Sequence, residues 1–139
     1  MKRCPWAVND ELMIKYHDEE WGVPVHNDKK LFEFMILDAF QAGLSWKIIL
    51  HKRDAFRKAF DDFDYTLIAE YGDDKIDELL QNKSIIRNKL KIKAAVTNAQ
   101  AFTRIIQEFK SFDDYIWGFT NNKTVINQFR KYSCQNNII

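Results

Sequence analysis

Apolar residues along the chain recur with the spacing of α-helices, and we find no convincing alternation with the period of two that marks a β-strand. Only four glycines and two prolines are present, so there is little material for turns. The pattern therefore predicts an all-α fold. The expected helices cover Glu11–Glu20, a segment from a cap at Asp28 to about Ala42, Trp46–Phe60, Asp64–Tyr71, Asp73–Gln81 and Lys89–Phe109.

Individual residues mark several helix ends. Ser45 can cap the helix that starts at Trp46. The run 111–114 fits an acidic capping box, and the helix behind it is expected to bury an apolar stripe made of Phe112, Tyr115, Ile116 and Phe119. We interpret residues 1–139 as one domain, with an irregular N-terminal arm (1–10), a hairpin near residues 82–92 and a tail (130–139).

Composition narrows the class of protein. Hydrophobic residues make up 46% of the 139 residues and charged residues 29%, which is ordinary for a soluble globular domain. A disordered chain, a collagen-like chain and a disulfide scaffold are therefore excluded. The two cysteines, Cys4 and Cys134, come with no export signal and no apolar run of membrane-span length. We expect a cytoplasmic protein with free or metal-bound thiols, no membrane partner, and no feature that supports an oligomer.

Charge is unevenly distributed although the net charge is only +1. The segment 61–78 has eight acidic residues and one basic residue, whereas the segment 83–110 has seven basic residues and one acidic residue. Either the two helical segments pair with each other, or one face of a neutral molecule is basic. Charge alone slightly favours the first alternative.

Asp38 is the first candidate for chemistry, because it interrupts the apolar run 34–40 in the middle of a helix. A helix that is apolar on all sides is buried, and a buried carboxylate is rare unless it is paired. Asp38 therefore either caps or pairs with a neighbouring element, or it lies at the bottom of a pocket. In a pocket it would bind a cation or stabilise developing positive charge.

Aromatic residues form the second candidate group. Any one of Trp6, Tyr16, Trp21 and Trp46 is by default a core residue. Two or three such rings beside one carboxylate would, however, form a cage for a flat cationic ligand. A desolvated cation–π contact contributes about 2 kcal/mol or more.

Metal and phosphate sites are less clearly indicated. Cys4 and His17 are zinc-type ligands, but two ligands do not make a structural site, and His26, His51 and Cys134 add no compact pair. The basic segment 82–93 could hold a DNA phosphate at a helix start, or it could be an ordinary αα-hairpin with solvated lysines.

Taken together, four motifs are specific enough to point to one protein family. They are Arg3-Cys4-x-Trp6, Tyr16-His17-Asp18-x-Glu20-Trp21-Gly22-Val23-Pro24, Gln41-Ala42-Gly43-Leu44-Ser45-Trp46 and Ile85-Ile86-Arg87-Asn88-Lys89-x-Lys91-Ile92. With these motifs the chain closely resembles the DNA-3-methyladenine glycosylase I family from Cys4 to about Phe129. The resemblance implies a helix-hairpin-helix bundle that removes 3-methyladenine from alkylated double-stranded DNA. Water, not an enzyme lysine, would attack the sugar.

The resemblance also implies roles for individual residues. In the pocket, Tyr16 and Trp46 look like stacking walls, and Trp6 and Trp21 look like further lining. Asp38 occupies the place of the family's usual glutamate, which hydrogen-bonds the base. Residues outside the pocket would fill the DNA gap (Gln41 and Leu44), grip phosphates (Ser84, Arg87, Lys89 and Lys91) and supply two of the four ligands of a structural zinc (Cys4 and His17).

Two departures from the family pattern matter. Asp38 is one methylene shorter than glutamate, and a shift near 1 Å can cost about 10²-fold in rate. The chain is also C-terminally short, because family members continue with a segment that carries a histidine and a cysteine of the zinc site. Cys134 is a poor substitute, and half a zinc site should bind metal only weakly. The alternatives to an active glycosylase are therefore a non-catalytic or impaired DNA-binding remnant and a poorly stable product.

Overall fold

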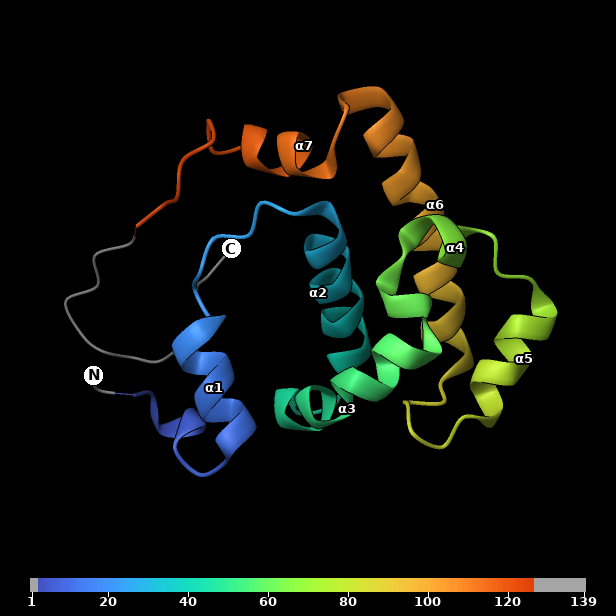
Figure 1. The fold of residues 1–139 in the computed structure, drawn as a ribbon, viewed down its shortest axis with the longest axis horizontal. Coiled ribbons are helices and arrows are strands. Elements are labelled where there is room, and N and C mark those ends of the chain that lie inside the picture. The colour runs from blue at the N-terminus through green and yellow to red at the C-terminus, as the bar shows by residue number, and fades with distance from the viewer. Residues whose placement is uncertain (1–2, 127–139) are drawn as a thin grey trace.

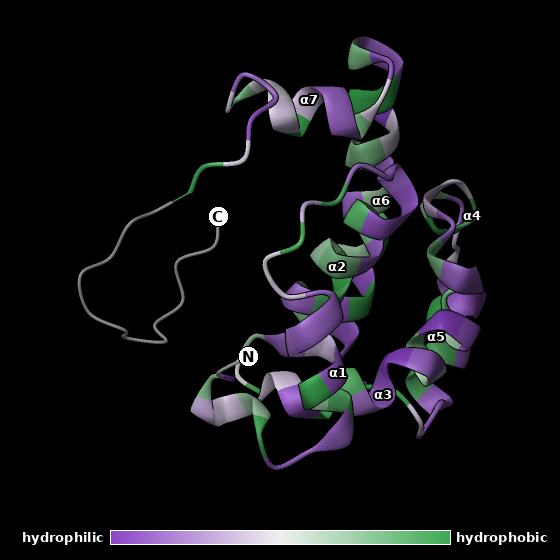
Figure 2. Ribbon diagram, turned by 60° about the vertical axis from the view of Figure 1, so that its left-hand side comes forward, coloured by the Kyte–Doolittle hydropathy of each residue, from purple (hydrophilic) through white to green (hydrophobic). Residues whose placement is uncertain are grey.

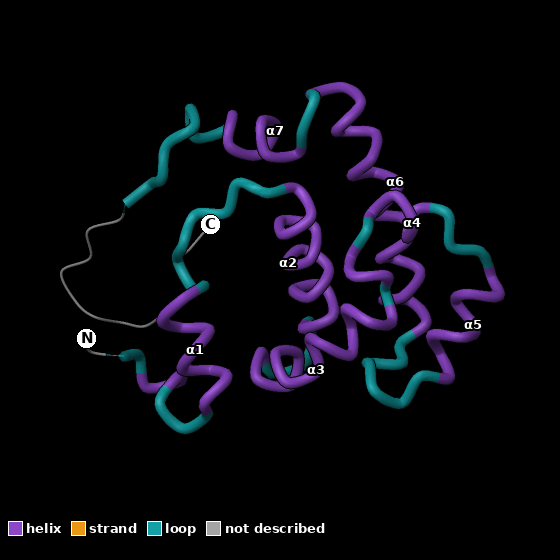
Figure 3. The backbone as a smooth tube through the Cα atoms, in the orientation of Figure 1, coloured by secondary structure: helices purple, strands orange, loops and turns teal. Residues whose placement is uncertain are grey.

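The computed structural model describes residues 3–126 of the chain. Within that range all regular elements are helices and none is a strand, so the predicted all-α fold is confirmed (Figure 3). None of the helices formed by these residues combines the length and apolar character needed to cross a lipid bilayer. The predicted tail 130–139, with Cys134, lies outside the described residues. In chain order the elements are η1 (Pro5–Ala7), α1 (Glu11–Glu19), α2 (Asp28–Gln41), α3 (Trp46–Ala59), η2 (Asp61–Phe63), α4 (Tyr65–Ala69), α5 (Asp73–Gln81), α6 (Lys89–Phe109) and α7 (Phe112–Gly118).

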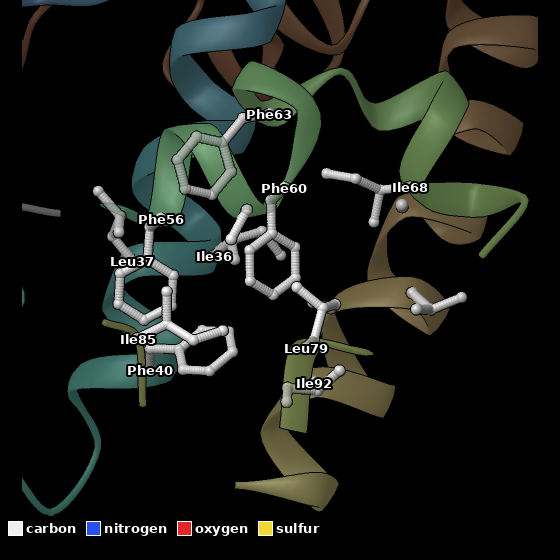
Figure 4. Packing of buried hydrophobic residues seen from close by; sticks show 14 of the residues in the cluster. Ile36, Leu37, Phe40, Phe56, Phe60, Phe63, Ile68, Leu79, Ile85 and Ile92 are labelled. Atoms are coloured by element: carbon white, nitrogen blue, oxygen red, sulfur yellow. The ribbon is translucent and has the colours of Figure 1, made fainter. Parts of the chain in front are cut away.

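Helix α2 runs through the middle of the described structure, with α1 on one side and α6 on the other, while α3 lies across its C-terminal end (Figure 1). Its buried residues belong to one core. Phe40 of α2 contacts Phe56 of α3 with ring centroids 4.8 Å apart, and Phe60 lies 5.8 Å from Phe40 (Figure 4). Ile36 and Leu37 are also fully buried. This packing fixes the backbone on which Asp38 and Trp46 are carried.

Two predicted caps are confirmed and one is wrong. Ser45 Oγ accepts a hydrogen bond from Ile48 N (3.4 Å), and Ser111 Oγ accepts one from Asp114 N (2.9 Å). The cap of α2, however, is Asn27, whose Oδ1 accepts from Lys30 N at 2.9 Å. Asp28 is instead the first residue of α2, and its carboxylate caps α7.

Asp28 joins the start of α2 to the start of α7. Its carboxylate accepts hydrogen bonds from the N–H groups of Phe112 (3.2 Å) and Asp113 (2.8 Å). Trp117 Nε1 donates to Val25 O at 2.9 Å, so α7 is held at both its start and its end. Asp28 serves α7 because Asn27 already satisfies the first turn of α2.

The apolar stripe predicted for α7 is only half correct. Phe112 and Tyr115 are half-buried, whereas Ile116 is 40% exposed and Phe119 is 72% exposed. No element formed by residues 3–126 covers that side of α7, which lies at one edge of the molecule (Figure 2). Amphipathic spacing identified the helix but could not show whether a second element covers it. Helix α4 is also shorter than the predicted Asp64–Tyr71, because Asp64 is its N-terminal cap and Glu70 its C-terminal cap.

Candidate functional site

A cavity of about 530 Å³ opens where η1, α1, α2 and the start of α3 meet. This size falls in the range of roughly 300–1,000 Å³ that is typical of small-molecule sites. Met13 and Lys47 were not among the predicted site residues, although Met13 lies three positions before Tyr16 and therefore on the same face of α1. The lining residues are Trp6, Met13, Tyr16, Trp21, Asp38, Gln41, Ser45, Trp46 and Lys47.

Asp38 projects from α2 into this cavity. Its side chain is exposed, not buried in the core, and no hydrogen bond or ion pair within residues 3–126 involves its carboxylate. The interpretation of Asp38 as a cap or an ion-pair partner therefore finds no support in the described residues. The protein surrounding the cavity partly desolvates the carboxylate, and this raises the pKa of Asp38 above its usual value.

The four predicted aromatic residues do meet at the cavity. The Tyr16 and Trp46 rings lie 5.4 Å apart at 52°, and the Trp6 and Trp21 rings lie 5.4 Å apart at 80°. Trp6 and Tyr16 connect the two pairs at 6.3 Å. A base held between Tyr16 and Trp46 would need about 7 Å, since stacked carbon atoms approach to about 3.5 Å. In this structure the two rings therefore form one continuous aromatic wall, and their role in stacking against a base stays a prediction.

Two polar groups of this wall keep hydrogen-bonding capacity. Burial, followed by the negative charges of Asp38 and Glu20, raises the pKa of Tyr16 to about 12, so its hydroxyl stays protonated at neutral pH. The buried Nε1 of Trp46 has no hydrogen-bond partner among the described residues. Buried donors are nearly always satisfied in proteins, so an unpaired indole N–H beside a cavity is unusual.

Ion pairs that sequence reasoning missed hold the cavity walls together. Arg53 of α3 donates from Nη1 and Nη2 to the two oxygens of Glu20 at 2.8 and 2.9 Å. Partial burial opposes the charge of Glu20, but the hydrogen bonds and charge of Arg53 outweigh it and lower the pKa of that carboxyl. At the other end of α1, Asp10 accepts from His51 (2.8 Å) and contacts Lys47 (3.0 Å). Partners 33 to 41 residues apart leave no local signal in a sequence.

The predicted hairpin lies between α5 and α6, and its basic residues differ in their surroundings. Arg87 and Lys89 are exposed, as is Ser84, whose carbonyl accepts from Lys52 Nζ at 3.0 Å. Helices α4 and α5 of the acidic segment 61–78 pack against α6 of the basic segment 83–110, as the first alternative expected, but no ion pair within residues 3–126 joins the two segments. Lys91, in contrast, donates to backbone carbonyls of the α2 end.

Residues 6–137 match the family described as methyladenine glycosylase. The chain belongs to the methyladenine glycosylase family. It is 41% identical over 128 residues to "DNA-3-methyladenine glycosylase 1" of Escherichia coli (strain K12), a match that spans 92% of this chain and 68% of the relative.

Solved structures of this family have the same fold. A crystal structure of 3-methyladenine DNA glycosylase I superposes with a TM-score of 0.87 at 43% identity, over 91% of this chain and 70% of that one. A variant of 3-methyladenine DNA glycosylase I solved in complex with 3-methyladenine gives a TM-score of 0.85 at 34% identity, over 88% and 66% of the two chains. The glycosylase chain thus spans about two thirds of the length of these relatives.

In this glycosylase the turn between α2 and α3 is closed by hydrogen bonds between Gln41 and Leu44. Gln41 Nε2 donates to Leu44 O at 2.8 Å, and Leu44 N donates to Gln41 O at 2.7 Å. Gly43 has a φ of +79°, which other residues rarely adopt. In this structure the Gln41 side chain is thus tied within the turn and does not extend outward as a wedge. The insertion of Gln41 and Leu44 into a DNA gap stays a prediction.

Cys4 and His17 are the two residues that the family resemblance assigns to a structural zinc site. Cys4 N donates to His17 Nε2 (3.3 Å), and His17 Nδ1 donates to Asp18 Oδ1 (3.0 Å), so both ring nitrogens have partners. Residues 3–126 contain no group of three or more histidine, cysteine, aspartate or glutamate side chains placed to hold a metal ion. Cys4 and His17 are thus in contact, but residues 3–126 do not fit a four-ligand zinc site, and the role of the two residues as zinc ligands stays a prediction.

Proposed function

We propose that this protein excises 3-methyladenine from alkylated double-stranded DNA by hydrolysing the N-glycosidic bond. The observation that carries the proposal is the unpaired Asp38 carboxylate in a cavity lined by four aromatic rings. The relative solved with 3-methyladenine supports this ligand. A cytoplasmic location and a monomeric state belong to the same proposal.

The cavity suits a flat cation better than a neutral base. Methylation at N3 leaves adenine positively charged, and both the aromatic wall and the carboxylate attract positive charge. A contact of this kind contributes about 2 kcal/mol when it is desolvated. Taking a base out of the DNA stack costs a few kcal/mol, so selective attraction for the damaged base offsets the cost only for the correct target.

Hydrolysis then needs little acid catalysis from the protein. The bond between the sugar C1′ and the base nitrogen breaks, and its electron pair goes to the base and neutralises it. A water oxygen bonds to C1′ and releases its proton to solvent. Asp38 is placed to stabilise positive charge during this step, and the Tyr16 hydroxyl can donate a hydrogen bond throughout. Ser84, Arg87 and Lys89 would contact phosphates outside the cavity.

Single-turnover base release tests the proposal. Purified protein is mixed with methylated duplex DNA, and the freed bases are separated and identified. Wild type should release 3-methyladenine, whereas Asp38→Asn and Trp46→Ala should release it at least about 10²-fold more slowly. The matched control is Asp77→Asn, the same change at an exposed residue of α5.

A second candidate function is DNA binding without base release, which the exposed basic residues Arg87 and Lys89 favour. It predicts salt-dependent binding of duplex DNA, weakened by Arg87→Ala or Lys89→Ala, and no free base. A protein that melts cooperatively, binds DNA and releases no base would replace the first proposal with this one.

A further inference from the structure

Lys91 has contacts that set it apart from the other basic residues of the hairpin. Its ammonium donates to Phe40 O at 2.8 Å and to Ala42 O at 2.5 Å. An ammonium has three N–H donors, so two of them are directed at the main chain of another helix. Arg87 and Lys89 are exposed and have no ion pair within residues 3–126.

The two carbonyls that Lys91 contacts lie at the C-terminal end of α2. The last carbonyls of a helix have no partner within the helix, and a cation there is favourable because of the helix dipole. Helix α2 has no basic residue in its own last turn. Lys91, which is 49 residues from Ala42, supplies that charge from the start of α6.

The end of α2 leads directly to the residues of the cavity. Asp38 lies in the last turn of α2, and Trp46 is the first residue of α3 after a four-residue turn. The hydrogen bonds between Gln41 and Leu44 close that turn internally. Lys91 joins the first residue of this turn, Ala42, to the start of α6.

We propose that Lys91 is a positioning residue, which holds the α2–α3 turn and so fixes Asp38 and Trp46, and that it is not a phosphate ligand. This inference rests on the proposed function and replaces the phosphate role that the family resemblance implied for Lys91. It makes the hairpin a mechanical link, because DNA held by Arg87 and Lys89 is coupled to the cavity through Lys91 in the first turn of α6.

Three variants that each remove one positive charge test the proposal: Lys91→Met, Lys89→Met and Lys93→Met. Lys93 is exposed on α6 and serves as the control. The measurements are the single-turnover rate at saturating DNA and the slope of log affinity against log salt concentration. Lys91→Met should lower the rate about tenfold or more with the wild-type slope, because misplacement of about 1 Å is costly. Lys89→Met should make the slope less steep by about 0.9.

A Lys91→Met protein with the wild-type rate and a slope reduced like that of Lys89→Met would overturn the proposal. If Lys91→Met does not melt cooperatively, Lys91→Arg replaces it. The planar guanidinium keeps the charge but not the single donor point, so the rate should still fall with an unchanged slope. A Lys91→Arg protein with the wild-type rate would contradict the positioning role.

Hydrogen exchange of the free protein separates this inference from the proposed function. The main-chain amides of residues 41–46 should exchange about tenfold faster in Lys91→Met than in wild type or Lys93→Met, because a link to the turn is lost. This result is expected even if wild type releases no base. Equal exchange in all three proteins would exclude the link, whatever their activity.

Discussion

Two carboxylates on the same helix, Glu33 and Asp38, have opposite surroundings. Glu33 is only 7% exposed, and it is paired with Arg57 Nη2 at 2.7 Å and Lys30 Nζ at 3.1 Å. Asp38 lies little more than one turn further along α2, opens into the cavity, and has no ion pair within residues 3–126.

The difference separates a charge that maintains the scaffold from a charge kept available for a ligand. Glu33 joins α2 to α3 through Arg57, and its charge is compensated in the folded protein. Asp38 is partly desolvated without compensation, which destabilises the fold but leaves the carboxylate ready to attract a cationic base. Functional sites often retain such unfavourable local arrangements.

The largest effect is expected from removing the charge of Asp38. Asp38→Asn should lower the single-turnover rate of 3-methyladenine release by about 10²–10³-fold, the usual loss when one group that stabilises a developing charge is removed. The same variant should unfold at an equal or higher urea concentration than wild type, since an uncompensated charge is lost. A variant that is both inactive and clearly less stable would place Asp38 in the scaffold instead.

Glu33→Gln should have the reverse outcome. It leaves Arg57 and Lys30 without their shared partner, and breaking a fully buried pair costs about 3–5 kcal/mol. Both bases are about one third exposed (31% and 32%), so we expect a smaller loss, about 2 kcal/mol, seen as a melting temperature roughly 5–10 °C lower. Where the variant is folded, its base-release rate should stay within about threefold of wild type. A rate as low as that of Asp38→Asn would remove the distinction between the two carboxylates.

The local sequence pattern could predict most of the helices and most of the residues that line the cavity. Helices α5 and α6 have the predicted bounds, because their apolar spacing and flanking polar residues are local features. Asp38 and the aromatic residues were identifiable, since a lone carboxylate in an apolar helix stands out and the family motifs contain the rest.

What the sequence could not show depends on partners distant along the chain. The pairing of Glu20 with Arg53, the capping of α7 by Asp28 and the contact of Lys91 with α2 each join residues 33 to 85 positions apart. The tilt of Tyr16 against Trp46 is a matter of packing, so only coordinates reveal that the two rings form one wall.

Asp38→Glu sharpens the comparison, because it lengthens the unpaired carboxylate by one methylene and keeps its charge. A displacement near 1 Å changes rates by up to about 10²-fold. If the shorter side chain limits contact with the base, the single-turnover rate should rise about tenfold, while Glu33→Asp should only lose stability. An unchanged or lower rate for Asp38→Glu would mean that the backbone of this chain already compensates for the shorter residue.

The pH dependence of stability should differ between the unpaired and the paired carboxylates. Because the pKa of Asp38 is raised in the folded state, the folded protein holds more protons than the unfolded protein between about pH 4 and that raised pKa. The contribution of Asp38 to stability therefore falls as pH rises through this range. The lowered pKa of Glu20 has the opposite sign, and its contribution is lost as pH falls below the usual glutamate value. Urea melts of wild type and Asp38→Asn should therefore differ most at neutral pH and converge toward about pH 4. A constant difference would exclude a shifted pKa at Asp38.

The smallest effect is expected from metal removal. This experiment tests whether the N-terminal arm, which carries Trp6, is held by paired charges of the kind that hold the scaffold. Arg3 Nε and Nη2 donate to Asp18 Oδ2 at 2.9 and 2.8 Å, and Arg3 Nε also donates to Asp18 Oδ1. Asp18 Oδ1 accepts a further hydrogen bond from His17 Nδ1. These contacts join the arm to α1, and they lower the pKa of Asp18 to about 2, chiefly through the Arg3 hydrogen bonds. Prolonged dialysis against a chelator should therefore leave base release within about twofold of the untreated protein, whereas Asp18→Asn should weaken Trp6 packing, measured as a change in tryptophan fluorescence. A rate that falls on chelation and returns with zinc would show that a metal, not the paired charges, holds this wall of the cavity.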